Sequence, residues 1–309
     1  MTEQYLIAMD AGGSKTEAVL FTPDGTVIKH ILASGINPFV DGFEQACSAC
    51  VSILDQLSAI AQQPVDNAYV GMPALQYFQG RIEAYLQKKT PIRHIRAEAD
   101  GYMLISAMLG HTDGASLVCG TGSGIYIRSQ GNQYGIGGWG YILDGCGSGF
   151  VLGRRALRAV VRQADGRGEK TLITQLVNEQ YGDDITKHLP ELYAGGRPFF
   201  ASFARTVFQA RKMGDMVARR IFDDCVSGLA EMVQTAWVQS SIQHLVLNGG
   251  IFRHFPEYVD ALKMHTPTQV NMIESDLPPL YGAAVEAMHD YGRTCDLEFK
   301  ERFLHNLKK

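Results

Sequence analysis

The chain has 309 residues and a mass of 33.9 kDa, which is enough for about two domains of ordinary size. Its 28 basic and 32 acidic residues give a formal net charge of −4, so the composition provides no basic field for a nucleic-acid backbone. The pattern shows no signal peptide, no apolar run of the roughly 18–20 residues that span a bilayer, and no disulfide framework. We therefore expect a cytoplasmic protein with no nucleic-acid or membrane partner.

Short apolar runs predict that the chain opens with an antiparallel meander of three strands. The first run ends at Asp10 and leads into a glycine turn, and the turn Pro23-Asp24-Gly25 separates the second and third runs. Apolar residues at helical spacing then predict a helix over Phe43–Ala61, in which Cys47 and Cys50 are expected to pack as small apolar side chains. The three strands are expected at Tyr5–Met9, Glu17–Phe21 and Thr26–Leu32.

Strand and helix patterns continue to alternate as far as Leu109. Asp100 stands where a predicted strand passes into a predicted helix. Its carboxylate is either a plain helix cap, a position that aspartate favours, or a functional group that the helix N-terminus keeps ionised. The strands are expected at Ala68–Gly71 and Ile92–Ala97, and the helices at Leu75–Leu86 and from about Asp100 to Leu109.

The pattern of strand, glycine turn and strand then recurs, with Gly13 and Gly122 at equivalent places. This recurrence predicts a duplicated architecture of two lobes. A hairpin turn is expected at Gly131-Asn132, and the rest of the second lobe reads as mostly helical. Its strands are expected at Ala115–Cys119, Ile125–Ile127, His244–Leu247 and Val270–Ile273, and its helices at Gly149–Val161, Lys170–Tyr181, Phe199–Lys212, Asp215–Gln239, Phe255–Met264 and Leu280–His289.

The two glycine turns have the composition of phosphate-binding loops. The first contains Gly-Ser-Lys-Thr but is not a Walker loop, because Lys15 follows Ser14 instead of a glycine and a strand follows in place of a helix. The second lacks the third glycine of a dinucleotide-binding fingerprint. Bare backbone N–H groups with nearby hydroxyls can still cradle phosphates, and Asp10 at the strand end is suited to hold Mg²⁺ directly or through water.

Nine short motifs, in order over nearly the whole chain, resemble the actin-like sugar kinases. The resemblance is to the N-acetylglucosamine kinase group of the BadF/BadG/BcrA/BcrD ATPase family. It implies an α/β, two-lobed actin-like (ribonuclease H-like) fold with ATP and Mg²⁺ in the interdomain cleft. The motifs are Asp10–Thr16, Gly35–Pro38, Glu98–Gly101, Cys119–Ser123, Gly137–Gly140, Gly147–Gly149, Met213–Asp215, Asn248–Gly250 and Pro279–Ala283.

The resemblance also implies a role for each matching residue. Asp100 falls where such kinases place the base that accepts the proton of the attacking hydroxyl. The positions implied for ATP and its phosphates are Asp10, Gly12, Gly13, Ser14, Lys15, Thr16, Thr121, Gly122, Ser123, Gly214, Gly249 and Gly250. Those implied for the sugar are Asn37, Asp100, Gly138, Trp139, Gly140 and Asp144. Trp139 either stacks on a sugar face or packs in the core.

One segment departs from the family pattern. The sugar-binding turn of the family continues with Asp-Glu four residues after Gly-Gly-Trp-Gly, whereas this chain has Gly145 and Cys146 at those places. The nearest acid, Asp144, comes one position early. Either the loop bends so that Asp144 takes over, or the substrate differs from N-acetylglucosamine.

These observations predict an ATP-dependent kinase that phosphorylates a hydroxyl of an amino sugar such as N-acetylglucosamine or glucosamine. Residues 1–113, joined by 291–309, are expected to form the N-terminal lobe and residues 114–290 the C-terminal lobe, and a homodimer is expected. One alternative is an ATPase that activates a 2-hydroxyacyl-CoA dehydratase, with Cys119 and Cys146 on an iron–sulfur cluster. The other is a non-catalytic ATP-binding sensor with the same fold.

Overall fold

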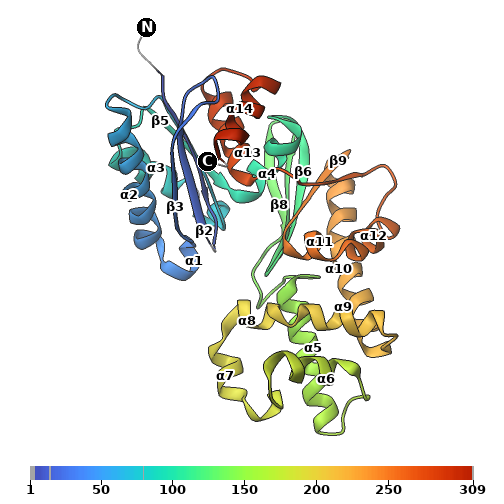
Figure 1. The fold of residues 1–309 in the computed structure, drawn as a ribbon. Helices are drawn as coiled ribbons and strands as arrows, with labels where there is room; N and C mark the ends of the chain where they lie inside the picture. Colours follow the sequence, from blue (N-terminus) through green and yellow to red (C-terminus); the bar gives the residue numbers. More distant parts are fainter. Residues whose placement is uncertain (1–3, 14, 79, 308–309) are drawn as a thin grey trace. The chain divides into compact units, whose positions relative to one another are not determined.

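The computed structural model describes residues 4–13, 15–78 and 80–307, and these form two compact units (Figure 1). One unit contains the described residues up to Asp113 together with those from Ser275 onward, and the other is Gly114–Glu274. The expectation that residues 275–290 belong to the second lobe is therefore wrong. The chain leaves the first unit, builds the second and returns.

The first unit is a five-stranded mixed sheet with helices on both faces (Figure 1). Its strand order is β3-β2-β1-β4-β5, with β1, β2 and β3 antiparallel and β4 and β5 parallel to β1. Every residue of β1 and β4 is buried, as expected of central strands covered on both sides. The strands are β1 Leu6–Ala11, β2 Lys15–Phe21, β3 Val27–Ser34, β4 Asn67–Met72 and β5 His94–Ala99.

The helices of this unit divide between two hydrophobic cores. One core packs α2 and α3 against the sheet, and the other packs α4, α13 and α14 against it. Cys47 and Cys50 lie fully buried on α2, and burial raises the pKa of Cys50 to about 12, so the expected packing role is confirmed. The helices are α1 Pro38–Asp41, α2 Phe43–Ala61, η1 Leu75–Phe78, α3 Arg81–Lys89, α4 Asp100–Leu109, α13 Pro279–Asp290 and α14 Leu297–Leu307.

The second unit repeats the strand order of the first. Its sheet runs β8-β7-β6-β9-β10, again three antiparallel strands followed by two parallel ones, so the predicted duplication is confirmed. The expected hairpin turn is present but lies one residue earlier, at Gln130 and Gly131, which both have positive φ, because Asn132 already begins a strand, β8, that the sequence pattern did not reveal. The strands are β6 Gly114–Cys119, β7 Ser123–Ser129, β8 Asn132–Gly137, β9 His244–Asn248 and β10 Asn271–Glu274.

Two helices that periodicity predicted as continuous, over Leu75–Leu86 and Phe199–Lys212, are divided in the structure, the second into the end of α8 and α9. The expected helix over Leu75–Leu86 becomes η1 and α3, with Gly80 at a φ of +76° where α3 begins. The expected helix near Phe255–Met264 is confirmed as α12, which begins at Pro256 because proline is tolerated in the first turn of a helix, and a short helix that the sequence pattern did not reveal, α11, precedes it. The helices of the second unit are α5 Gly149–Ala164, α6 Leu172–Tyr181, η2 Ile185–Lys187, α7 Leu189–Ala194, α8 Gly196–Ser202, α9 Ala204–Lys212, α10 Met216–Ser240, α11 Gly250–His254 and α12 Pro256–Met264.

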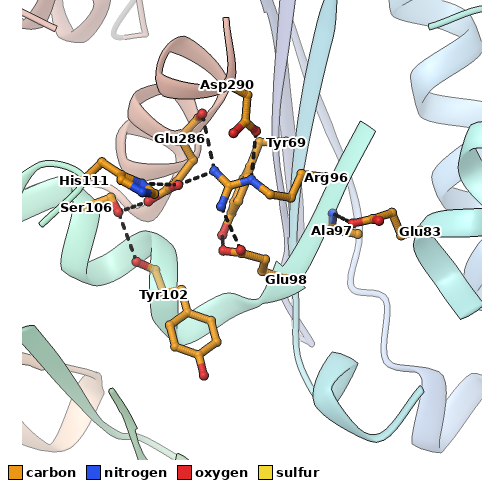
Figure 2. A network of polar contacts seen from close by, with 10 residues as sticks. All are labelled: Tyr69, Glu83, Arg96, Ala97, Glu98, Tyr102, Ser106, His111, Glu286 and Asp290. Carbon is orange, nitrogen blue, oxygen red and sulfur yellow. Dashed lines mark hydrogen bonds and ion pairs between the residues drawn. The ribbon is translucent and has the colours of Figure 1, made fainter. Parts of the chain in front are cut away.

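A buried ion network attaches α13 to strand β5 of the first unit (Figure 2). The Arg96 guanidinium on β5 contacts Glu98 at 2.7 Å, Asp290 at 2.8 Å and the fully buried Glu286 of α13. Glu286 also accepts a bond from His111 Nδ1 at 2.9 Å. Burial opposes the charged form of Arg96, but the three carboxylates outweigh it and raise its pKa above the ordinary value.

Close backbone packing adds to this attachment. A Cβ at Gly282 would lie 1.8 Å from the carbonyl oxygen of Met103, so only glycine allows α13 to approach α4 this closely. The network and this contact together fix β5 and α4, the two elements that meet at Asp100. The fold thus uses a distant C-terminal helix to hold the junction that carries the candidate base.

We predict that Glu286→Ala lowers the free energy of unfolding by about 3–5 kcal/mol, because it leaves a buried guanidinium short of a partner. Urea unfolding measures this change. The matched control is Arg93→Ala, which removes an exposed ion pair with Asp66 in the same unit and should cost no more than about 1 kcal/mol. Equal effects of the two substitutions would contradict a stabilising role for the buried network.

Candidate functional site

Two carboxylates lie at the carboxyl edge of the first sheet. Strands β1, β4 and β5 are parallel, so their carboxyl ends meet at the same edge. Asp10, near the end of β1, pairs in register with Gly71 of β4. Asp100 directly follows Ala99, the last residue of β5. The topology therefore brings together two acids that are far apart in the sequence.

The Asp10 carboxyl group is 9% exposed, and its pKa is raised from 3.8 to about 7. Burial is the largest cause, followed by the negative charges of Asp100 and Glu17, while Lys15 opposes the shift. A cation placed beside Asp10 would relieve this repulsion and favour the ionised form. The position thus fits Mg²⁺, which is commonly held by one or two carboxylates with water and phosphate oxygens completing its shell.

Asp100 is not the cap of its helix. Ala99 occupies the N-cap position of α4 without a side-chain capping bond, and Asp100 is the first helical residue. The plain-cap alternative is therefore wrong. The helix N-terminus still favours a negative charge in this first turn, so the carboxylate is placed where it can act as a base.

The first glycine turn lies next to Asn37. The Gly12 carbonyl oxygen accepts a 3.0 Å bond from the N–H of Ile36, and a Cβ at Gly13 would lie 3.7 Å from Asn37 Nδ2. Asn37 caps α1 through its Oδ1, which accepts a bond from the N–H of Phe39 at 2.9 Å. This leaves its amide NH₂ directed toward the turn as a hydrogen-bond donor. Ser14 lies outside the described residues.

The side chains of the two residues after Ser14 differ in exposure. Lys15 is on the surface and pairs with Glu17 at 2.5 Å. Thr16 is 1% exposed, so its hydroxyl lies inside the sheet and not at the surface of the turn. Of the two side chains, the Lys15 ammonium group is the one that an external phosphate could reach.

The second glycine turn is held by the start of α5. The carbonyl oxygens of Gly120 and Thr121 accept bonds from the N–H groups of Gly149 (2.8 Å) and Phe150 (3.2 Å). Ser123 Oγ donates to the carbonyl oxygen of Cys146 at 2.6 Å, so its hydroxyl is already engaged in fixing the turn. With the carbonyls turned to the helix, the N–H groups of Thr121 and Gly122 are the polar groups left for an anion.

An arginine that sequence reasoning missed also lies at this turn. A Cβ at Gly122 would be 3.4 Å from Arg197 Nη2, so the guanidinium group of Arg197, which belongs to α8, lies beside the turn. The same group lies over the ring of Tyr141, with 5.2 Å from Cζ to the ring centroid. No motif surrounds Arg197, and only the packing of α8 against α5 brings it to the turn. A guanidinium here can bind an anion with a forked pair of N–H groups.

The structure also brings Gly249 and Gly250, two of the positions implied for ATP, to the end of β6. Gly249, at a φ of +120°, packs so closely that a Cβ would lie 2.2 Å from the carbonyl oxygen of Cys119. Gly250 follows it and begins α11. Gly214 lies on a different turn, between α9 and α10, where Met213 and Met216 expose 60% and 55% of their surface. These methionines offer the apolar surface that a flat ring would cover.

The expected sugar turn is exposed and contains the displaced acid. Trp139 is 63% exposed between Gly138 and Gly140, so its alternative role in core packing is wrong. Asp144 Oδ2 approaches the N–H of Trp139 to 3.5 Å, and a Cβ at Gly137 would lie 3.1 Å from the same oxygen. The loop therefore folds Asp144 back onto the tryptophan turn.

The two cysteines of the iron–sulfur alternative differ in accessibility. Cys119 is completely buried, and burial raises the pKa of its thiol, which disfavours the thiolate that a cluster ligand must form. Cys146 is exposed. Over residues 4–13, 15–78 and 80–307, no three metal-ligating side chains of His, Cys, Asp or Glu gather at a common point.

A match to a known protein family accounts for this arrangement of turns. The sequence model of the BadF/BadG/BcrA/BcrD ATPase family matches residues 7–287. The chain belongs to this family. An N-acetylmuramic acid/N-acetylglucosamine kinase of Clostridium acetobutylicum is 25% identical, with 92% of this chain and 98% of that protein covered. The glucosamine kinase GspK of Vibrio cholerae is 23% identical over 82% of this chain and 87% of its own length.

A solved structure from Chromobacterium violaceum, provisionally named an N-acetylglucosamine kinase, superposes with a TM-score of 0.71. It is 22% identical, and the match covers 92% of this chain and 98% of that one. With the family match and the duplicated sheets, this places the chain in the two-lobed actin-like α/β fold. Among the described residues, none of the helices combines the length and apolar character needed to cross a membrane.

We predict that Asp10→Asn stabilises the protein in a pH-dependent way. The unfolded carboxyl titrates near 3.8 and the folded one near 7, so the free energy of unfolding falls as the pH rises between these values. Asparagine removes that cost. The variant should gain little at pH 4 and up to about 4 kcal/mol above pH 7.

Urea unfolding at several pH values measures this difference. Asp55→Asn, a change on the exposed face of α2, is the control and should shift stability equally at all pH values. A gain for Asp10→Asn that does not vary with pH would show that the buried carboxyl is not the origin of the effect.

Proposed function

We propose that this chain is an ATP-dependent kinase that phosphorylates a hydroxyl of an amino sugar. The observation that carries the proposal is the pairing of Asp10 with Asp100 at one sheet edge, next to a glycine turn and Asn37. Membership in an ATPase family and relatives named as kinases of N-acetylmuramic acid, N-acetylglucosamine and glucosamine support it.

The proposed chemistry needs little covalent help from the protein. Asp100 would accept the proton of the sugar hydroxyl as that oxygen attacks the terminal phosphoryl group of ATP. Backbone N–H groups at Gly12, Gly13, Thr121 and Gly122 would hold the phosphates in place. Asp10 would hold Mg²⁺, directly or through water, and Mg²⁺ when bound neutralises charge on the phosphates. The cation would also offset the repulsion that Asp10 exerts on Asp100.

The remaining predicted residues divide between nucleotide and sugar. Lys15 and Ser123 would assist at the phosphate turns, one by charge and the other by fixing the loop. Gly249 and Gly250 would support the adenosine, with Gly214 near the base. The Asn37 amide and the Asp144 carboxylate would bind sugar hydroxyls, and the exposed Trp139 would stack on an apolar sugar face.

The proposal also includes the assembly state and the cellular location of the protein. We expect a homodimer in the cytoplasm, where a sugar kinase has access to ATP. Light scattering on the purified chain measures the assembly state, and a monomer at working concentration would contradict it.

We predict that Asp100→Asn loses at least about 100-fold in kcat while its affinity for ATP changes little, because the proton acceptor is removed and the residues proposed to hold the phosphates are kept. A panel of hexoses and hexosamines in a coupled ADP assay identifies the substrate, and calorimetry measures ATP binding. Wild-type turnover by this variant would exclude Asp100 as the base. ADP release that no sugar accelerates would instead favour an ATPase activator, and ATP binding without ADP release would favour a non-catalytic sensor.

We predict that Asp144→Asn raises the KM for the best sugar of that panel by roughly tenfold while kcat falls much less, because a carboxylate–hydroxyl bond is lost in binding. Steady-state kinetics with varied sugar measures both parameters. Asp260→Asn, at an exposed position of α12, is the control and should leave both unchanged. An unchanged KM for Asp144→Asn would mean that another group replaces the acid missing at Gly145 and Cys146.

A further inference from the structure

A polar cavity lies wholly within the second unit, between α5 and α10. Its volume is about 840 Å³, which is within the usual range for small-molecule sites. Ala159, Val217 and Ile221 form its apolar floor. Six arginines line it, and none is among the residues assigned to ATP or sugar: Arg154, Arg155, Arg158, Arg162, Arg167 and Arg220.

The sequence itself places three of these arginines on one side of α5. Arg154, Arg158 and Arg162 follow one another at four-residue intervals on α5, so they form a single stripe. Like charges at this spacing repel one another and destabilise the helix. The turn through Gly166 and Gly168 then brings a further arginine to the same cavity. An arrangement that costs stability in the empty chain is one that a bound anion would stabilise.

The carboxylates near the cavity neutralise only half of the arginines. Arg155 pairs with Asp224 at 2.9 Å, Arg220 with Glu169 at 2.5 Å, and Arg167 with Asp165.

The other three guanidinium groups have a different environment. Arg162 donates to the carbonyl oxygen of Arg167 at 2.9 Å, and the nearby Asp165 carboxylate, which attracts it, is already paired with Arg167. Arg154 and Arg158 have no carboxylate within ion-pair distance in the described part of the chain, although Arg154 lies over the ring of Phe150. The cavity therefore has a net positive charge in a protein whose overall charge is −4.

We propose that this cavity is a binding site for a small phosphorylated metabolite, separate from the kinase site. A guanidinium presents a rigid fork of N–H groups that matches the oxygens of a phosphate, and several forks facing one cavity suit a phosphomonoester. The apolar floor would contact the carbon skeleton. The proposal is independent of the kinase activity, since it uses none of the residues assigned to it.

The shape and the acids of the cavity favour a small ligand over a nucleic acid. A duplex or single strand binds along an open basic stripe, whereas this site is a hollow with Glu169 and Asp224 in its wall. Those two carboxylates would repel a continuous phosphate backbone. They can accept bonds from the hydroxyls of a compact ligand.

Isothermal titration of the full chain, without Mg²⁺, tests the proposal with three probes: inorganic phosphate, AMP and glucose 6-phosphate. We expect at least one phosphate ester to bind in the millimolar range or tighter. The double variant Arg154→Gln/Arg158→Gln should weaken that binding by at least about tenfold. Arg158→Lys, which keeps the charge but loses the fork, should weaken it measurably. The preference between AMP and glucose 6-phosphate distinguishes a nucleotide from a sugar phosphate as the source.

The control is Arg205→Gln/Arg219→Gln, which removes two exposed charges of the same unit outside the cavity and should bind as the wild type does. Melting curves check that all variants are folded. Several results would overturn the proposal: no binding of any probe, equal binding by Arg154→Gln/Arg158→Gln and wild type, or full retention by Arg158→Lys. Tight binding of a single-stranded oligonucleotide without binding of the small probes would also overturn it.

Discussion

Repulsion between two carboxylates at one sheet edge is the constraint on which the candidate site depends. Asp10 is buried near the end of a central strand, and both its burial and the charge of Asp100 favour its neutral form. An amide or apolar side chain would be more stable at this position, so the carboxyl group costs stability in the empty chain. A cation beside it would compensate the repulsion, and a strongly shifted carboxyl group of this kind marks a candidate functional position.

The duplicated sheet explains how the two glycine turns arise. In each unit the first two strands form an antiparallel hairpin, and parallel strands continue from the first of them. A hairpin of this kind exposes backbone N–H groups at its tip, while the neighbouring parallel strands bring further loops to the same edge. In the first unit these loops supply Asp100, and in the second they supply Gly249 beside the end of β6. The same topology thus places different residues at the edge of the sheet in the two units.

Arginine has two distinct uses in this chain. Arg96 is surrounded by the carboxylates of Glu98, Glu286 and Asp290, so its charge is satisfied within the protein and fixes α13 to the sheet. The arginines of the cavity between α5 and α10 outnumber their acidic partners, so part of their charge is left for a ligand. Burial and partner count separate a structural guanidinium from one available for binding, and neither is visible in composition.

The sequence by itself determined the features that depend on local spacing. Helical periodicity gave α2 with its observed bounds, the glycine turns marked both hairpins, and ordered motifs led to the ATPase family. Tertiary structure alone decided that α13 returns to the first unit, that Arg197 reaches the second turn, and that Asp144 folds back to Trp139. It also divided helices that periodicity joined, and it raised the pKa of Asp10 through burial first and then through the charge of Asp100, ninety positions away. Spacing along a chain indicates which side of a single element is apolar. The outcomes decided by tertiary structure depend instead on which elements meet in space. Burial and charge, summed over the whole fold, determine those meetings.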